Sequence, residues 1–130
     1  MIVSDGGDTH SPIHGKDVLS GVAESNVQIY AMRIFDEAPR TKAERMGPDL
    51  LATITKITGG RVFPIHSLKK IGSATAELSV ELRNQYLIAY RPSNLTHDGK
   101  WHKISVFVTP PQNSSRLRVY AKAGYCAPAE

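Results

Sequence analysis

Residues 27–35 read Val-Gln-Ile-Tyr-Ala-Met-Arg-Ile-Phe, a nearly continuous apolar run rich in residues that favour β-strands. Strands with this composition are typical of parallel sheets, because helices cover such sheets on both faces. We therefore expect residues 27–35 to form a parallel strand, and the flanking sequence to supply helices.

Two elements are predicted before this run. Met1–Ser4 is short, apolar and β-prone, and it leads directly into Asp5-Gly6-Gly7-Asp8, a strong turn signal. The sequence therefore predicts a strand followed by a loop. Lys16–Ser25 then carries apolar residues at the spacing of one helix face, namely Val18, Leu19, Val22 and Ala23.

After the run, residues 36–46 are charged, contain Pro39 and are expected to form a loop. Gly47-Pro48-Asp49 predicts a helix start, with Pro48 at the first helical position and Asp49 favourable to the helix dipole. The apolar positions of this helix are Leu50, Leu51, Ile54 and Ile57, and Gly59-Gly60 ends it.

A third strand is predicted at Arg61–Ile65, followed by a helix that Ser67 can cap. The expected apolar face of this helix consists of Leu68, Ile71, Thr75, Leu78 and Leu82. The alternation of strands and helices over residues 1–85 predicts an α/β fold, a partial doubly wound parallel sheet with flanking helices.

Residues 86–130 have a different character. Three β-prone runs, Tyr86–Tyr90, Trp101–Val108 and Leu117–Lys122, follow one another without an intervening helical segment. Turn sequences separate them, and apolar and polar residues alternate along the last two runs. We expect a three-stranded antiparallel extension, buried on one side and packed on the first part of the chain.

Composition limits the classes of function. The 130 residues are the size of one domain, and no apolar run approaches the roughly 20 residues of a membrane span. The first residues lack the basic and long apolar stretches of a signal peptide. Cys126 is the only cysteine, which excludes an intramolecular disulfide and a cysteine-cluster metal site. The net charge is +4, and the positive excess falls within residues 66–130.

The segment Ile2–Asp8 resembles the fourth-strand motif of von Willebrand factor A domains, in which an apolar strand ends in a Ser/Thr-Asp-Gly turn. Residues 27–31 are similar to the fifth strand of that family. Residues 47–63 are similar to its next helix and sixth strand.

The remaining sequence resembles a bacterial branch, the VWFA-related proteins abundant in acidobacteria. The matching segments are Glu81–Tyr86, Tyr90-Arg91-Pro92, Asp98-Gly99-Lys100 and Gly124-Tyr125. The resemblance covers essentially the whole chain, and its specificity comes from the order of these segments.

The resemblance implies a non-enzymatic protein-recognition or adhesion module of unidentified partner, exported or attached to the cell envelope of a bacterium. It places residues 1–85 in the carboxyl-terminal half of an A-type domain and residues 86–130 in a β extension. Of the family's cation ligands only Asp5 is present, because no Asp-x-Ser-x-Ser sequence occurs in the chain. An intact domain would bind Mg²⁺ or Ca²⁺, whereas no cofactor is expected for this chain.

The resemblance therefore also implies a truncated domain whose first strand is missing. In such a domain, strand 1–4 would be an uncovered edge, and bare edges recruit other strands. We expect the chain to form a homo-oligomer through that edge, or the extension to fold over it.

A second interpretation of the residues around Asp5 stays open. Asp5, Asp8, His10 and His14 lie within ten residues, where the carboxyl end of a parallel strand is expected. Carboxylates suit Mg²⁺ or Ca²⁺ and imidazoles suit zinc, although Pro12 interrupts a regular helical pair of histidines. Alternatively, the two aspartates stabilise the glycine-containing turn or cap the next helix.

The sequence contains no Gly-x-Ser-x-Gly elbow, phosphate-binding loop or dinucleotide fingerprint, so we expect no enzymatic activity. A rival function is binding of nucleic acid or another polyanion. It rests on basic residues among five aromatic ones in the extension, Tyr86, Tyr90, Trp101, Phe107 and Tyr120. The alternation of apolar and polar residues along these strands would bury many of the rings in the core. Buried rings cannot stack on bases, so nucleic acid is the less favoured partner.

Overall fold

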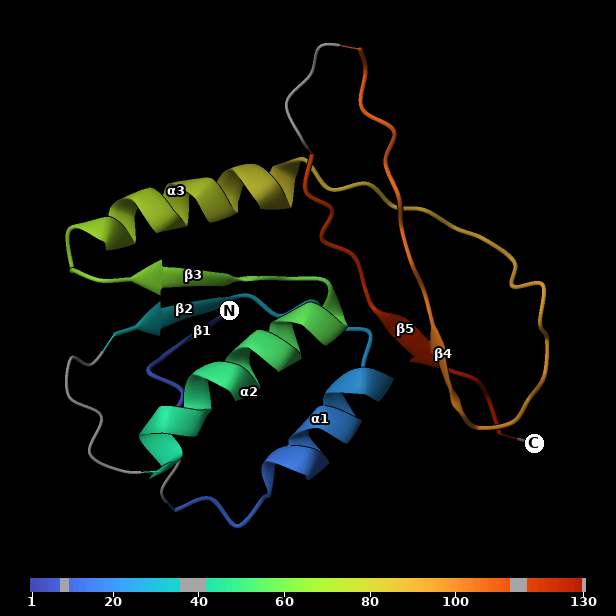
Figure 1. Ribbon diagram of the computed structural model, residues 1–130, viewed down its shortest axis with the longest axis horizontal. Coiled ribbons are helices and arrows are strands. Elements are labelled where there is room, and N and C mark those ends of the chain that lie inside the picture. The colour runs from blue at the N-terminus through green and yellow to red at the C-terminus, as the bar shows by residue number, and fades with distance from the viewer. Residues whose placement is uncertain (8–9, 36–41, 113–116, 130) are drawn as a thin grey trace.

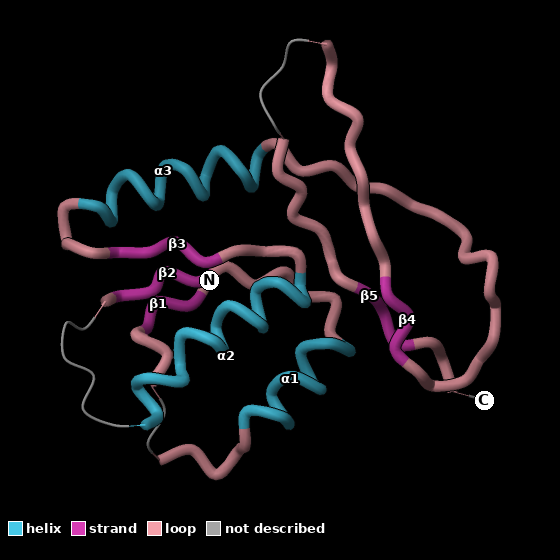
Figure 2. The backbone as a smooth tube through the Cα atoms, viewed as in Figure 1, coloured by secondary structure: helices cyan, strands magenta, loops and turns pink. Residues whose placement is uncertain are grey.

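The computed structural model describes residues 1–7, 10–35, 42–112 and 117–129, with the side chains of helix α2 described from residue 46 onward. Figures 1 and 2 show the arrangement of its helices and strands. The elements are β1 (Ile2–Ser4), α1 (Gly15–Glu24), β2 (Ala31–Ile34), α2 (Lys42–Thr58), β3 (Val62–Ile65), α3 (Lys70–Arg83), β4 (Trp101–Lys103) and β5 (Gly124–Cys126). Among the described helices, none is long and apolar enough to cross a membrane.

The first three strands form a parallel sheet in the order β1-β2-β3. Ile2 pairs with Ala31, and Met32 pairs with Phe63. The α/β class and the parallel pairing of the first predicted strand are therefore confirmed. β2 lies in the middle of the sheet, and Ala31 and Met32 are both buried because helices cover both faces.

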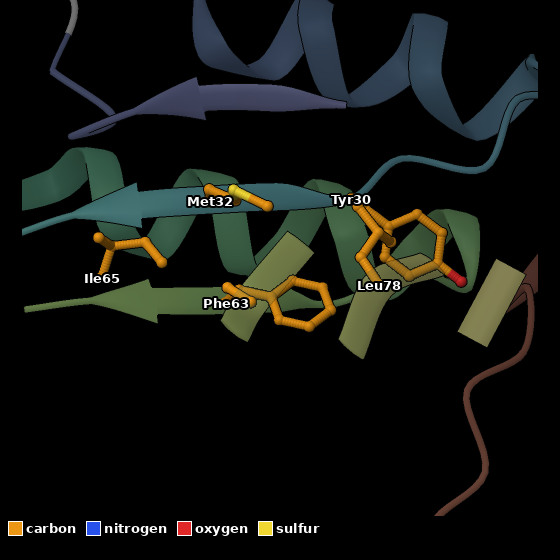
Figure 3. Close-up of a cluster of buried hydrophobic side chains, with 6 residues drawn as sticks. Tyr30, Met32, Phe63, Ile65 and Leu78 are labelled. Atoms are coloured by element: carbon orange, nitrogen blue, oxygen red, sulfur yellow. The ribbon is translucent and has the colours of Figure 1, made fainter. Parts of the chain in front are cut away.

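One layer of the core lies between the sheet and α3 (Figure 3). Tyr30, Met32, Phe63 and Ile65 meet Leu78 of α3, and Ala74 completes the cluster. On the opposite face, α2 buries Leu51, Ile54 and Thr55, and α1 packs beside α2 (Figure 1).

β2 is shorter than the predicted strand 27–35. The backbone N–H of Ile29 donates to Thr58 Oγ1 at 3.1 Å, and Gln28 Nε2 donates to the carbonyl oxygen of Gly59 at 2.8 Å. These residues therefore bond to the end of α2 before the chain enters the sheet. Val27 remains exposed, which its apolar character did not predict.

The predicted start of α2 at Gly47-Pro48 is wrong, because the helix begins at Lys42 and contains Pro48. The start of α3 also differs. Ser67 does not cap it through its side chain; instead, its carbonyl oxygen accepts the N–H of Lys70, where the helix begins. A turn therefore separates Ser67 from the helix.

The predicted apolar face of α3 is correct at Leu78 and wrong at Leu68 and Leu82. The buried residues are Ala74 and Leu78, whereas Leu82 is 50% exposed and Leu68 is 80% exposed. α3 therefore contributes Ala74 and Leu78 to the core cluster with the sheet.

The described part of the extension, residues 86–112 and 117–129, contains two paired strands rather than the predicted three. β4 and β5 are antiparallel, with Trp101 opposite Cys126 and Lys103 opposite Gly124. The runs 86–90 and 117–122 lie outside strands. The antiparallel arrangement is thus confirmed, and the three-stranded sheet is corrected to a two-stranded one.

β5 lies after the predicted run 117–122, and its first residue, Gly124, approaches β4 closely. A Cβ at this position would lie 2.5 Å from the indole ring of Trp101, so only glycine lets that ring lie against the strand. The preceding residues bond to the helices instead of to a third strand. Ala123 N–H donates to Ile57 O at 3.0 Å, and Lys122 Nζ donates to Ser25 O at 2.8 Å.

Candidate functional site

The turn after β1 lies at the carboxyl edge of the parallel sheet, where open α/β sheets bind ligands. Ser4 Oγ accepts the N–H of Gly6 at 2.9 Å, and Asp5 Oδ1 accepts the N–H of Gly7 at 2.9 Å. Gly6 has a φ of 88°, a backbone conformation that residues with a side chain rarely adopt. Asp5 therefore stabilises the turn with one of its carboxylate oxygens.

The other candidate metal ligands are Asp8, His10 and His14. Asp8 lies outside the described residues. Within the described parts of the chain, no three His, Cys, Asp or Glu side chains gather closely enough to hold a metal ion. Asp5 thus remains the one residue for which the resemblance implies a cation contact.

A hollow of about 530 Å³ lies between the segment leading into α1, with the start of that helix, and the middle of α2. Its polar lining includes His10, Ser11, His14, Asp49 and Thr53, and its apolar lining includes Ile13, Leu19, Met46 and Leu50. Gly6 reaches the hollow, but Asp5 is not among its lining residues. The two histidines and Asp5 therefore do not converge on one centre.

A stack of three side chains at the same edge was not predicted. The Arg33 guanidinium lies 3.8 Å from the centre of the Phe35 ring, and that ring stacks on His66 at 3.9 Å and 17°. Arg33 lies in β2, Phe35 directly follows that strand, and His66 directly follows β3. Because parallel strands end at one edge, their positions could have suggested the proximity, although not the stacking.

Arg61 connects three parts of the molecule. It pairs with Glu77 and Glu81 of α3, and its guanidinium lies 4.1 Å from the ring centre of Phe63 and 5.5 Å from that of Tyr120. Burial alone would lower the pKa of Arg61, but hydrogen bonds and charge attraction from both glutamates raise it overall. Arg61 is therefore a cation that holds α3, the sheet and the extension together.

The aromatic residues of the extension lie largely outside the core. Tyr86 is 92% exposed and Phe107 is 90% exposed, and the side chains of Tyr90, Trp101 and Tyr120 are also accessible. The expectation that alternation would bury many of these rings is therefore wrong. Residues 86–90 and 117–122 do not join the sheet, so no three-stranded sheet forms that could bury these rings on one face.

Basic residues accompany these rings. Arg91, Lys100, Lys103 and Arg118 are exposed, whereas Arg116 lies outside the described residues. The extension holds six Lys and Arg against two Asp and Glu, and residues 1–85 hold ten of each sign. The whole net charge of +4 therefore resides in the extension.

The paired strands of the extension carry a second polar cluster. Asp98 Oδ1 lies 3.1 Å from His102 Nε2 and accepts the backbone N–H of Lys100 at 3.0 Å. The bond from Lys100 and the contact with His102 lower the pKa of Asp98. The His102 ring packs 5.3 Å from that of Tyr125, so the cluster joins β4 to β5.

A scan of the chain against protein-family models, a search of curated proteins and a search of solved structures each give no match.

Proposed function

We propose that the chain is a non-enzymatic protein-interaction module of the von Willebrand A type, with an incomplete metal-ion-dependent adhesion site. The Ser4-Asp5-Gly6 turn at the carboxyl end of a parallel strand supports the family resemblance. The observation that carries the interaction role is the apolar surface of the extension, where Tyr86, Leu87 and Phe107 are each at least 90% exposed. Large apolar side chains that are exposed in this number favour a site of protein contact.

A photo-crosslinking amino acid at Leu87 tests this role in cells that express the chain. Cross-links from position 87 to protein are expected, identified by mass spectrometry. The control places the same group at Ser20, an exposed residue of α1. Protein cross-links from neither position, or equally from both, would contradict an interaction surface in the extension.

The residual cation contact needs a separate test. Oδ1 of Asp5 already accepts a hydrogen bond within the turn. One carboxylate with water molecules holds Mg²⁺ or Ca²⁺ only weakly. We expect millimolar Mg²⁺ to shift the amide signals of residues 4–7 in NMR spectra, and Asp5→Ala to abolish the shift. Asp17→Ala, a change on α1, should leave it intact; unmoved signals would remove Asp5 as a ligand.

Polyanion binding is the second candidate, and the exposed rings beside basic residues favour it. Bases stack on aromatic side chains while lysine and arginine contact phosphates. Single-stranded oligonucleotide should then bind at low salt and dissociate steeply as salt is added. Lys103→Glu and Arg118→Glu should weaken binding, and absence of binding at low salt would exclude this function.

A further inference from the structure

Two β-prone runs of the extension have bare backbones. Residues 86–90 and 105–108 form no backbone hydrogen bond with any other described residue. Both runs are free of charge and proline, and they include the most exposed apolar side chains, Tyr86, Leu87 and Phe107. Unpaired backbone beside exposed apolar side chains is the surface to which another strand adds.

The exposed area supports a missing partner. A self-sufficient domain of 14.2 kDa exposes about 6,800 Å² by the scaling of surface with mass. This chain exposes 10155 Å², which exceeds that value by about 3,400 Å². A stable homodimer covers roughly 1,000–2,500 Å² on each chain, so the excess is large enough for one.

We propose that a second copy of the chain covers this surface, with residues 86–90 of one copy pairing with residues 105–108 of the other. In a two-fold symmetric dimer the same contact occurs twice, so the backbone groups of both runs in both chains gain hydrogen-bond partners. One foreign strand would supply partners to a single run. The runs carry no charge, so no like charges face each other at the contact. The inference rests on the proposed function and names its partner.

The positive charge of the extension predicts how dimerisation should depend on salt concentration. Each extension carries +4, so two copies repel each other at low ionic strength. Added salt screens this repulsion and should strengthen the dimer. Polyanion binding has the opposite dependence, because salt weakens it.

Sedimentation velocity of the full chain over the micromolar range tests the proposal. The expected result is a monomer–dimer equilibrium that shifts toward dimer as sodium chloride is added. Leu87→Lys and Phe107→Lys should each raise the dissociation constant by roughly tenfold or more. Val80→Lys is the matched control, since Val80 is 60% exposed on α3 and outside both runs; it should leave the equilibrium unchanged.

Three outcomes would overturn the proposal: a monomer at every concentration, a dimer that Leu87→Lys leaves intact, or a dimer abolished instead by Val3→Lys at the edge of β1. A monomer that still cross-links from position 87 to a foreign protein would remove the second copy as partner while retaining the interaction role. Both proposals fail together only when protein cross-links and dimer are absent.

Discussion

Gly6 and Gly47 meet backbone to backbone at the carboxyl edge of the sheet. A Cβ on Gly6 would lie 2.6 Å from the carbonyl carbon of Gly47, and a Cβ on Gly47 would overlap the carbonyl oxygen of Gly6. The absence of both side chains lets α2 lie directly against the turn after β1. Gly47 lies inside α2, directly before Pro48, so the contact is made by the helix itself.

Gly47→Ala should therefore destabilise the chain by about 1–3 kcal/mol, because backbone atoms would have to move apart. Chemical denaturation followed by circular dichroism measures the change. Gly72→Ala is the matched control, since nothing lies within 4 Å of a Cβ there and alanine favours a helix. A larger loss for Gly72→Ala than for Gly47→Ala would refute the close approach.

Leu78→Ala should reduce the free energy of unfolding by about 2–5 kcal/mol, because Leu78 is buried in the cluster beneath α3. Leu82→Ala removes the same atoms from a side chain that is half exposed and should cost much less. Urea unfolding of the two variants compares them directly. Equal losses would mean that α3 faces the sheet as the periodicity predicted.

Gly124→Ala should displace the ring of Trp101 and disrupt the pairing of β4 with β5. Trp101 is the only tryptophan, so its fluorescence reports on these strands alone. We expect the emission to shift to longer wavelength as the indole gains water, while circular dichroism retains the helical signal. Gly21→Ala on α1, where no atom lies within 4 Å, should leave the emission unchanged.

The pairing of β4 with β5 should also depend on pH. The pKa of Asp98 is lowered in the folded chain, first by the hydrogen bond from Lys100 and then by His102. Its contribution is complete above the unfolded value of about 3.9 and is lost as the pH falls through the lower folded value. Trp101 emission should change in that acid range, and Asp98→Asn should remove the transition.

The sequence predicted the elements of residues 1–85 and their parallel pairing, because the apolar run at residues 27–35 and the glycines at positions 59 and 60 are local signals. For α3 it predicted the burial of Leu78 but not that of Ala74. Ala74 contributes little to an apolar pattern, yet it is buried in the cluster between α3 and the sheet.

The features missed at the candidate site depend on contacts between distant segments. The stack of Arg33, Phe35 and His66 requires knowledge of which loops meet at the sheet edge. The pairing of β4 with β5 brings Gly124 close to the ring of Trp101, a contact between segments that are distant in the sequence. The strand propensity of residues 86–90 describes a capacity to pair, and whether a partner lies within the same chain is a tertiary property.

The bonds that attach the extension to the helices have a consequence for the order of unfolding. Ile57 O is one of the last carbonyls of α2, and Ser25 O belongs to the residue that ends α1; neither has a partner within its own helix. Ala123 supplies the partner of Ile57 O, and Lys122 supplies the partner of Ser25 O from 97 residues along the chain. The ammonium group of Lys122 also suits the negative end of the α1 dipole. Release of the extension would thus fray both helices at once, so the amides of their last turns should exchange with solvent at the rate at which the extension detaches.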